Sequence, residues 1–379
     1  MIDVVVVGGG PVGLYLAALL LQHGVSVRVL ERRDAPNTHS RAIGIHPPSL
    51  EALDRIGVAS GLVAKGVQIR RGVAIGGGVE VAGMSFHTVS RCYPFVLSIP
   101  QARTEAALER RVRELDGGSL MRGATVTGLH DDGAKVAVDV LTSDGESRIH
   151  AAFVMAADGV RSTVRQQLAI PLRRKDYPDS YVMGDFADGT AFGPDAALFL
   201  EPAGIVESFP LPGGVRRWVA RTHRTGADTA TARSLAGIVW ERTGVAVDAG
   251  TNSMLSSFGV RTRLATRMIH GRIVLVGDAA HEISPIGGQG MNLGWLDAAG
   301  LAPLLLSLLA HADVERELQR FERQRLRAAA AAVRQSEINM LLGRPLPRAL
   351  WLARNRLIGY AAGVPGISER VAARFTMHS

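Results

Sequence analysis

The chain has 379 residues, of which 47% are hydrophobic, and a formal net charge of +8 at pH 7. This composition excludes a mainly disordered protein and allows a sizeable core with two interleaved domains. The single cysteine, Cys92, excludes an intrachain disulfide or a zinc site built on paired cysteines, so we predict no metal and a reducing compartment, the cytoplasm. The positive charge is nearly all arginine and is concentrated in 312–379, where no nucleic-acid-binding motif occurs, so we predict no nucleic-acid partner. No apolar run is long enough to predict a transmembrane segment.

Residues 4 to 31 predict a strand, a tight turn, a helix and a second strand. The turn contains Gly8, Gly10 and Gly13 in the spacing GxGxxG, with Pro11 and Val12 between the last two glycines. In such a unit the glycines permit the turn, the approach of a pyrophosphate and close packing of helix on strand. Glu31, followed by Arg32, ends the second strand, where a carboxylate can accept hydrogen bonds from a ribose. The pattern predicts a dinucleotide site and leaves FAD and NAD both open.

The rest of the chain predicts further elements in order. A helix is expected at 48–56, a strand-like segment at 73–98, a helix at 101–115, strands at 124–129, 135–142 and 152–156, several antiparallel strands in 181–222, a buried strand at 273–276, and helices to the end. We therefore predict an α/β fold: a Rossmann-like FAD-binding domain interleaved with a smaller, mainly antiparallel β-sheet substrate domain, followed by C-terminal helices. The predicted FAD-binding segments are 1–72, 99–180 and 263–311, the substrate segments are 73–98 and 181–262, and the C-terminal helical region is 312–379.

Two further motifs follow predicted buried strands. Asp158 and Gly159 begin the run DGVRSTVR after one strand. Asp278 lies in GDAAH after the other, and the chain continues through Pro285 into a glycine-rich turn. That turn contributes the candidate cofactor residues Gly288, Gly290, Met291 and Asn292. The arrangement can set an acceptor against a ribityl hydroxyl and helix N–H groups against the electron-rich edge of a flavin.

Together the three motifs resemble the FAD fingerprint, the DG motif and the GD motif of the class A flavin monooxygenases, the para-hydroxybenzoate hydroxylase-like aromatic hydroxylases. The resemblance covers about residues 1 to 310 and implies noncovalent FAD. For the adenosine end of FAD, it implies that Glu31 holds the ribose and that Thr125 and Val126 border the adenine. Arg41 and Gln101 would contact the diphosphate and ribityl region, and Asp278 would bind the ribityl chain or the diphosphate. Asp158 would support both FAD and the nicotinamide cofactor, and residues 285–292 would line the isoalloxazine. We do not expect the thioredoxin-like C-terminal domain of the larger phenol and polyketide hydroxylases. The WxWxIP segment of the related flavin halogenases is not found, which disfavours halogenation.

The resemblance also implies the reaction. NAD(P)H reduces FAD, and O2 then forms a flavin C4a-hydroperoxide that transfers one oxygen atom to an apolar, aromatic or polycyclic small molecule. Because the flavin carries the chemistry, no catalytic residue is assigned. His46 and His281 are expected to serve in structural hydrogen bonding before acid–base work, with His46 retained as a candidate substrate residue. The side chains Tyr181, Met183, Phe199, Phe209 and Trp218 are expected in the core first and in the substrate pocket second.

Several alternatives stay open on sequence alone. The same scaffold serves flavin-dependent oxidases, dehydrogenases and reductases, and an accessory flavoprotein without turnover is a further alternative. Hydroxylation, epoxidation and Baeyer–Villiger insertion are not distinguished, nor are NADH and NADPH, or a monomer and a homodimer. The basic region 341–360 is expected to pack on the FAD-binding domain, and the alternative is peripheral contact with an anionic membrane.

Overall fold

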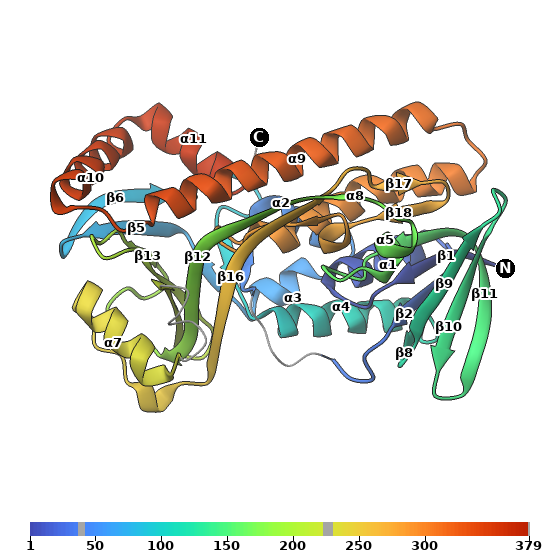
Figure 1. Cartoon of the computed structure of the whole chain (residues 1–379), viewed down its shortest axis with the longest axis horizontal. Helices are drawn as coiled ribbons and strands as arrows, with labels where there is room; N and C mark the ends of the chain where they lie inside the picture. The colour runs from blue at the N-terminus through green and yellow to red at the C-terminus, as the bar shows by residue number, and fades with distance from the viewer. Residues whose placement is uncertain (37–41, 223–229, 378–379) are drawn as a thin grey trace.

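The computed structural model describes residues 1–36, 42–222 and 230–377. Its first sheet is built around parallel strands in the order β18 (Ile273–Leu275), β11 (Gly145–Ala156), β1 (Ile2–Val7), β2 (Val27–Glu31) and β8 (Leu120–Arg122). Antiparallel strands extend it: β17 (Ile269–His270) beside β18, and β10 (Val136–Thr142) with β9 (Thr125–Asp131) beside the first half of β11. This is the Rossmann-like sheet that the sequence predicts (Figure 1).

The helix α1 (Pro11–Gln22) follows β1 and is buried along most of its length. It packs between α4 (Gln101–Leu115) and α8 (Gln289–Leu309). By length and composition α8 could span a membrane, but half of its apolar window is buried in the fold, as expected of a core helix. Apolar residues on all sides of α1 explain why it is covered by strands and helices rather than by water.

The second sheet is mainly antiparallel, as predicted. Its strands are ordered β19 (His281–Glu282), β16 (Met254–Ala265), β12 (Leu172–Ala187), β15 (Val215–Thr222), β14 (Val206–Leu211), β13 (Ala196–Phe199), β5 (Arg71–Gly76) and β6 (Val79–Ser85), and only β13 and β5 pair in parallel among them. Figure 1 shows β12 and β16 running from this sheet toward the first one. The boundaries expected at 180 and 262 between the FAD-binding and substrate segments therefore fall inside β12 and β16. Each of these two strands continues from one predicted domain into the other.

Short elements connect the sheets. A small third sheet pairs β3 (Gly44–Ile45), β7 (Val96–Ser98) and β4 (Val67–Ile69), so β7 leaves the second sheet, to which the sequence assigned 73–98. The short helices are α2 (Pro47–Asp54), α3 (Ala59–Val63), α5 (Thr163–Gln167) and α7 (Ala232–Thr243). Of these, α7 packs on β12, β14 and β15 and covers one face of the second sheet.

The C-terminal region is helical, as expected. It consists of α9 (Glu315–Leu342), α10 (Arg348–Ala362) and α11 (Pro365–Phe375). In Figure 1 the long helix α9 crosses the molecule from the first sheet toward the second, and α10 and α11 lie beside β5 and β6. On α10, the buried indole of Trp351 donates a hydrogen bond of 2.5 Å to the carbonyl of Leu200. Region 341–360 is thus anchored on the second sheet rather than on the first.

Candidate functional site

A cavity of about 1260 Å³ connects the two sheets. One part, here called the turn half, is lined by the turns that follow β1, β2, β11 and β18 and by the start of β9. The other part, here called the sheet half, is lined by one face of the second sheet and by α9, α10 and α11. Pockets for one small ligand measure about 300–1,000 Å³, so this cavity has room for more than one such molecule.

The glycine-rich turn between β1 and α1 opens onto the turn half. Gly8 has φ +107°, a conformation that favours glycine, and a Cβ there would collide with the carbonyl of Ala157. A Cβ at Gly13 would collide with the carbonyl of Gly8, so α1 starts in contact with β1. Gly10 differs, because a Cβ there would meet nothing within 4 Å and would point into open space. Gly10, Pro11 and Val12 line the cavity at the helix N-terminus.

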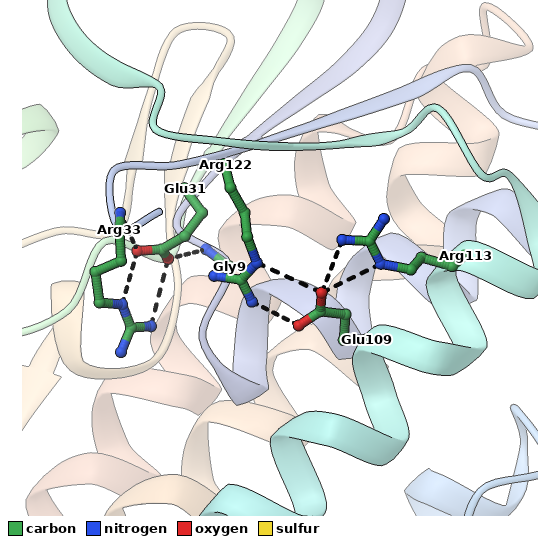
Figure 2. A network of polar contacts seen from close by, with 6 residues as sticks. All are labelled: Gly9, Glu31, Arg33, Glu109, Arg113 and Arg122. Carbon is green, nitrogen blue, oxygen red and sulfur yellow. Dashed lines mark hydrogen bonds and ion pairs between the residues drawn. The ribbon is translucent and has the colours of Figure 1, made fainter. Parts of the chain in front are cut away.

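Glu31 lies at the end of β2, directly behind this turn. Its carboxylate accepts hydrogen bonds from the backbone N–H of Gly9 at 2.7 Å and from Nε of Arg33 at 2.8 Å, as Figure 2 shows. Burial opposes ionisation of this group, but the hydrogen bonds from Arg33 and Gly9 hold the pKa of Glu31 below its usual value. The carboxylate is therefore charged and fixed at the cavity wall.

Arg33 also lines the cavity, and the sequence did not single it out. In register with Glu31, Arg122 on β8 forms an ion pair with Glu109 on α4 (Figure 2). Arg113 donates to the same carboxylate at 2.9 Å. Near the end of β2, Glu31 is thus paired with Arg33, and Glu109 is shared by Arg113 and Arg122. The only sequence signal for Arg33 was its place two residues after Glu31. There both its backbone N–H and its side chain reach the carboxylate of Glu31.

Asp158 follows β11 on the opposite side of the turn half. Its Oδ2 accepts a hydrogen bond from the N–H of Val164, while Oδ1 is buried and has no hydrogen-bond partner among the described residues. Burial raises the pKa of Asp158, although neighbouring donors lower it in part. The next helix, α5, is capped by Ser162, which accepts from the N–H of Arg165. Arg165 in turn donates to the carbonyl of Ala279 at 2.8 Å, which joins the second and third motifs.

Asp278 lies after β18 and opens into the cavity. Asp278 is exposed through this opening, and desolvation by the protein around it raises its pKa to about 6, while His281 lowers it in part. The following turn has positive φ at Gly287 (+98°) and Gly288 (+66°) and delivers the N-terminus of α8 to the cavity wall. Pro285, Gly288, Gly290 and Met291 all line the cavity, as the sequence predicts for this segment.

His281 lies behind this wall in a buried ion network. Its Nε2 is 2.5 Å from Oδ2 of Asp297 on α8, and Nε of Arg325 on α9 donates to Oδ1 of Asp297 at 2.6 Å. The N–H of Gly277 also donates to Asp297. Burial works against a charged imidazole, but the charge of Asp297 raises the pKa of His281 above its usual value. The contacts of His281 are those of a structural hydrogen-bonding residue, as we expected over acid–base work.

Asn292 does not line the cavity, which differs from its predicted place beside the flavin ring. Its Oδ1 accepts from the N–H of His46 at 2.9 Å, and its Nδ2 donates to the carbonyls of Gly44 and Gly288. The amide thus holds two wall segments together, because it lies one turn inside α8. His46 itself is buried and lines the cavity, with its ring 5.6 Å from that of Phe375 on α11.

The remaining predicted cofactor residues are spread around the turn half. Those that line the cavity are Arg32, Gln101, Thr125, Val126 and Gly159. Gln101 begins α4 and donates to Glu105 at 2.7 Å. Arg41 lies outside the described residues. Among the described residues, no group of three or more His, Cys, Asp or Glu side chains is arranged to hold a metal ion.

The two faces of the second sheet separate the predicted substrate residues. Met183 on β12 and Phe209 on β14 line the cavity. Tyr181 shares their face but is buried against the ring of Phe258, at 5.6 Å. Phe199 and Trp218 lie on the other face, in a core with Leu235 and Val239 of α7. Their place in the pocket is therefore corrected, since successive strand residues point to opposite faces.

Glu207 on β14 also lines the sheet half, although it was not among the residues predicted from the sequence. It is 8% exposed, and burial raises its pKa to about 7. Its segment, VESFPL, is buried at almost every position and so shows no alternation of buried and exposed residues. Without such a pattern or a motif, the sequence could not distinguish Glu207 from an exposed glutamate. Only the register of the sheet reveals that it faces the cavity.

Comparisons with known proteins agree with this geometry. The sequence family described as FAD binding domain matches residues 1–336. The chain is 33% identical over 364 residues to the 12-dehydrotetracycline 5-monooxygenase/anhydrotetracycline 6-monooxygenase of Streptomyces rimosus, covering 91% of this chain and 71% of the relative. It is 30% identical to the para-nitrophenol 4-monooxygenase of a Pseudomonas strain, covering 84% of this chain and 81% of that protein. The chain belongs to the FAD-dependent aromatic monooxygenases.

Solved structures of this family have the same fold. The anhydrotetracycline hydroxylase from Streptomyces rimosus superposes with a TM-score of 0.81 at 31% identity, covering 99% of this chain and 75% of that one. The p-nitrophenol 4-monooxygenase from Pseudomonas putida superposes with a TM-score of 0.91 at 24% identity over 100% of this chain and 98% of that one, which concerns the fold alone. As a member of this family, the protein is an FAD-dependent oxidoreductase, and NAD(P)H is the typical reductant.

Proposed function

We propose that this monooxygenase inserts one oxygen atom from O2 into a fused-ring or otherwise extended aromatic molecule that occupies the sheet half. The observation that carries the proposal is the continuous cavity, which joins the three glycine- and aspartate-containing motifs to an apolar sheet face. Relatives named for tetracycline intermediates, rifampicin and para-nitrophenol support an aromatic substrate, and the size of the cavity supports one with several rings. FAD, once bound, supplies the redox chemistry and the activation of oxygen.

The turn half fits FAD on two observations. The open space in front of Gly10 allows a pyrophosphate to approach the backbone at the N-terminus of α1, where free N–H groups favour anions. The buried, unpartnered Oδ1 of Asp158 needs a hydrogen-bond donor, which a hydroxyl or amide group of either cofactor provides. We assign the adenosine ribose to Glu31, whose fixed carboxylate accepts hydrogen bonds from hydroxyl groups. Thr125 and Val126, which line the same half, border the adenine.

The third motif orients the reactive end of the cofactor. With a pKa of about 6, Asp278 is mostly ionised at neutral pH. Its carboxylate would accept a hydrogen bond from the ribityl chain or lie near the diphosphate of bound FAD. The N-terminus of α8, entered through Gly288, opens onto the same wall, and its positive end would favour the electron-rich edge of a flavin ring bound there. Asn292 keeps this wall in place by binding Gly44, His46 and Gly288 together.

The sheet half contributes exclusion of water and positioning of the substrate. Met183, Leu198, Val219 and Phe258 give it an apolar floor, and Ile358 on α10 with Val371 on α11 closes it from the other side. Apolar walls protect reactive flavin species from water and place the substrate carbon near the site of oxygen transfer. No side chain needs to act as a nucleophile in this arrangement.

We place the protein in the cytoplasm, as a monomer or homodimer, with α10 packed on the second sheet through Trp351 and Asn355. The exposed side chains Leu350, Leu357 and Tyr360 of α10 are the surface that peripheral membrane contact would use. Sedimentation with anionic vesicles distinguishes a helix that only packs on the second sheet from one that also contacts a membrane. Salt-sensitive co-sedimentation that a triple substitution of these residues by Ser removes would favour membrane contact over simple packing.

Turnover separates the proposal from its alternatives. The FAD-loaded protein is mixed with NADH or NADPH and a panel of fused-ring phenols. Reduced nicotinamide and dissolved oxygen are followed together, and the aromatic products are identified by mass spectrometry. A monooxygenase consumes both, faster in the presence of its aromatic ligand. An oxidase, dehydrogenase or reductase forms no oxygenated aromatic product, and an accessory flavoprotein shows no ligand-stimulated consumption, so either result would overturn the proposal.

A further inference from the structure

Glu207 is a carboxyl group in the middle of the apolar floor of the sheet half. It lies on β14, and its cross-strand partners are Leu198 on β13 and Val219 on β15. Two residues away on the same strand, Phe209 also lines the cavity, as does Ile205 just before the strand. The four nearest cavity-lining residues on its own and the neighbouring strands, Leu198, Ile205, Phe209 and Val219, are therefore hydrocarbon side chains.

The other acids that this sheet holds inside the protein are paired, whereas Glu207 is not. Three aspartates each bind an arginine: Asp179 binds Arg221, Asp185 binds Arg217, and Asp188 binds Arg216. Glu201, another buried glutamate nearby, accepts a hydrogen bond of 2.9 Å from the N–H of Gly77. Among the described residues, no side chain or backbone group forms a hydrogen bond or ion pair with the carboxyl group of Glu207, and burial is the cause of its pKa of about 7.

An unpartnered carboxyl group in an apolar wall is unfavourable for the fold. Burial without a hydrogen-bond partner destabilises a polar group, and it destabilises a charged group more. A leucine would fill the same place between Leu198 and Val219 without that cost. The group is satisfied, however, as soon as a ligand in the cavity brings a hydrogen-bond donor to it.

We propose that Glu207 is the specificity-determining residue of the sheet half: its carboxyl group binds a hydroxyl group of the aromatic substrate and excludes substrates that bring a carboxylate to the same place. This inference rests on the proposed function for its substrate class. The side chains next to it, such as Leu198, Phe209 and Val219, offer only dispersion contacts, which hold a flat apolar ring system without fixing its orientation. One buried acceptor therefore decides which edge of the ring system points into the floor.

The other ionisable groups near the floor are paired, neutral or exposed, so none of them competes with Glu207 for a substrate hydroxyl group. Arg217 on β15 forms a two-point ion pair with Asp185 on β12, at 2.6 and 2.8 Å. Tyr181 on β12 stays neutral, because burial raises its pKa. On the helices, the residues of α9 and α10 that line the cavity are uncharged, and Arg374 on α11 is exposed. Glu207 is the group of this floor whose charge changes near neutral pH.

Equilibrium dialysis of the oxidised, FAD-loaded protein against three probes tests the proposal. 2-Naphthol carries a hydroxyl group, naphthalene lacks it, and 2-naphthoate replaces it by a carboxylate. We expect 2-naphthol to bind about tenfold more tightly than naphthalene, as one hydrogen bond to a carboxylate provides. Because ionised Glu207 repels a carboxylate, the dissociation constant of 2-naphthoate should rise about tenfold from pH 6 to pH 8.

Two variants assign these effects to Glu207. Glu207→Leu should remove the preference for 2-naphthol over naphthalene, and Glu207→Gln, which keeps an acceptor but no charge, should retain that preference and remove the pH dependence for 2-naphthoate. Glu201→Gln is the matched control, because Glu201 is equally buried but does not line the cavity. It should leave all three dissociation constants unchanged.

The result that would overturn the proposal is a wild-type protein without preference for 2-naphthol, including one that binds no probe, or variants of Glu207 that keep the wild-type pattern. Dialysis needs neither reduced nicotinamide nor oxygen transfer. Loss of the binding pattern therefore contradicts the role of Glu207, whereas absence of oxygenated product in the turnover assay contradicts the proposed function.

Discussion

The turn half and the sheet half of the cavity are built in opposite ways. Each wall of the turn half is one short run of sequence, such as Gly8 to Gly13 or Gly277 to Met291, whose turn geometry dictates its residues. The sheet half is assembled from strands and helices far apart in the sequence, and each contributes one or two side chains. Residues of the turn half are therefore restricted by local backbone shape, while those of the sheet half are free to change with the substrate.

The sheet itself contains a second contrast, between its cavity face and its core face. We expect Trp218→Ala to lower the free energy of unfolding by about 3–5 kcal/mol, since the indole is buried against α7 and leaves a hole when removed. Leu198→Ala, on the cavity face, should cost much less stability and instead weaken aromatic ligands. Denaturant titration and ligand dissociation constants measure both effects. Similar stability losses for the two variants would remove the distinction between the faces.

Behind the wall of the turn half, we expect the network of Asp297, His281 and Arg325 to contribute to stability rather than to catalysis. Asp297→Asn leaves His281 and Arg325 without their shared carboxylate, and breaking a buried ion pair costs about 3 kcal/mol or more. The pKa of Asp297 is lowered in the fold, so its contribution is present above the unfolded pKa and is lost as pH falls through the folded value. The pKa of His281 is raised, so its contribution is lost as pH rises through its folded value.

The difference in stability between wild type and Asp297→Asn should therefore be largest between about pH 4 and pH 6.5, the ordinary pKa values of the two groups. Thermal or denaturant unfolding across this range measures it. Asp139→Asn, which breaks an exposed pair with Arg148, is the control and should show little change. A difference that does not vary with pH would contradict the assigned network.

The open space in front of Gly10 allows a substitution that tests FAD binding in the turn half without destabilising the fold. Gly10 has φ −80° and no neighbour near its missing Cβ, so valine fits the backbone but occupies the expected path of the pyrophosphate. Gly10→Val should weaken FAD binding at least about 100-fold, or about 2.7 kcal/mol, without loss of folded protein. Gly61→Val, at an equally open glycine on α3 away from the cavity, should bind FAD normally. Fluorescence titration with FAD and circular dichroism give the two readouts.

A smaller effect is expected at Asp278. Replacing its carboxylate by Ala removes one charge-assisted hydrogen bond, worth about tenfold to a hundredfold in affinity for FAD. Asp144→Ala, in the exposed turn between β10 and β11, is the matched control. An unchanged FAD dissociation constant for Asp278→Ala would contradict the role assigned to the third motif.

The contrast between local turns and a sheet face assembled from distant strands also explains which features the sequence could predict. Turns such as the one at Gly8 and the bounds of α4 at Gln101 and Leu115 are local properties, and the structure agrees with both. The faces of Trp218 and Glu207 depend on strand register, and a shift of one residue exchanges the faces. Trp218, expected in the core first, was therefore also retained as a pocket candidate, and Glu207 was overlooked. Asn292 was misplaced for a related reason, because one helical position separates a wall residue from the residue that supports it.

The most direct test of the account is a turnover experiment under 18O2 with reduced nicotinamide and the fused-ring phenol that most stimulates its consumption. Mass spectrometry of the product measures the label. The account predicts one 18O atom in each product molecule and none when the label is supplied as H2 18O, because a monooxygenase takes the inserted atom from O2. A product without 18O from O2, formed while reduced nicotinamide is consumed, would contradict it.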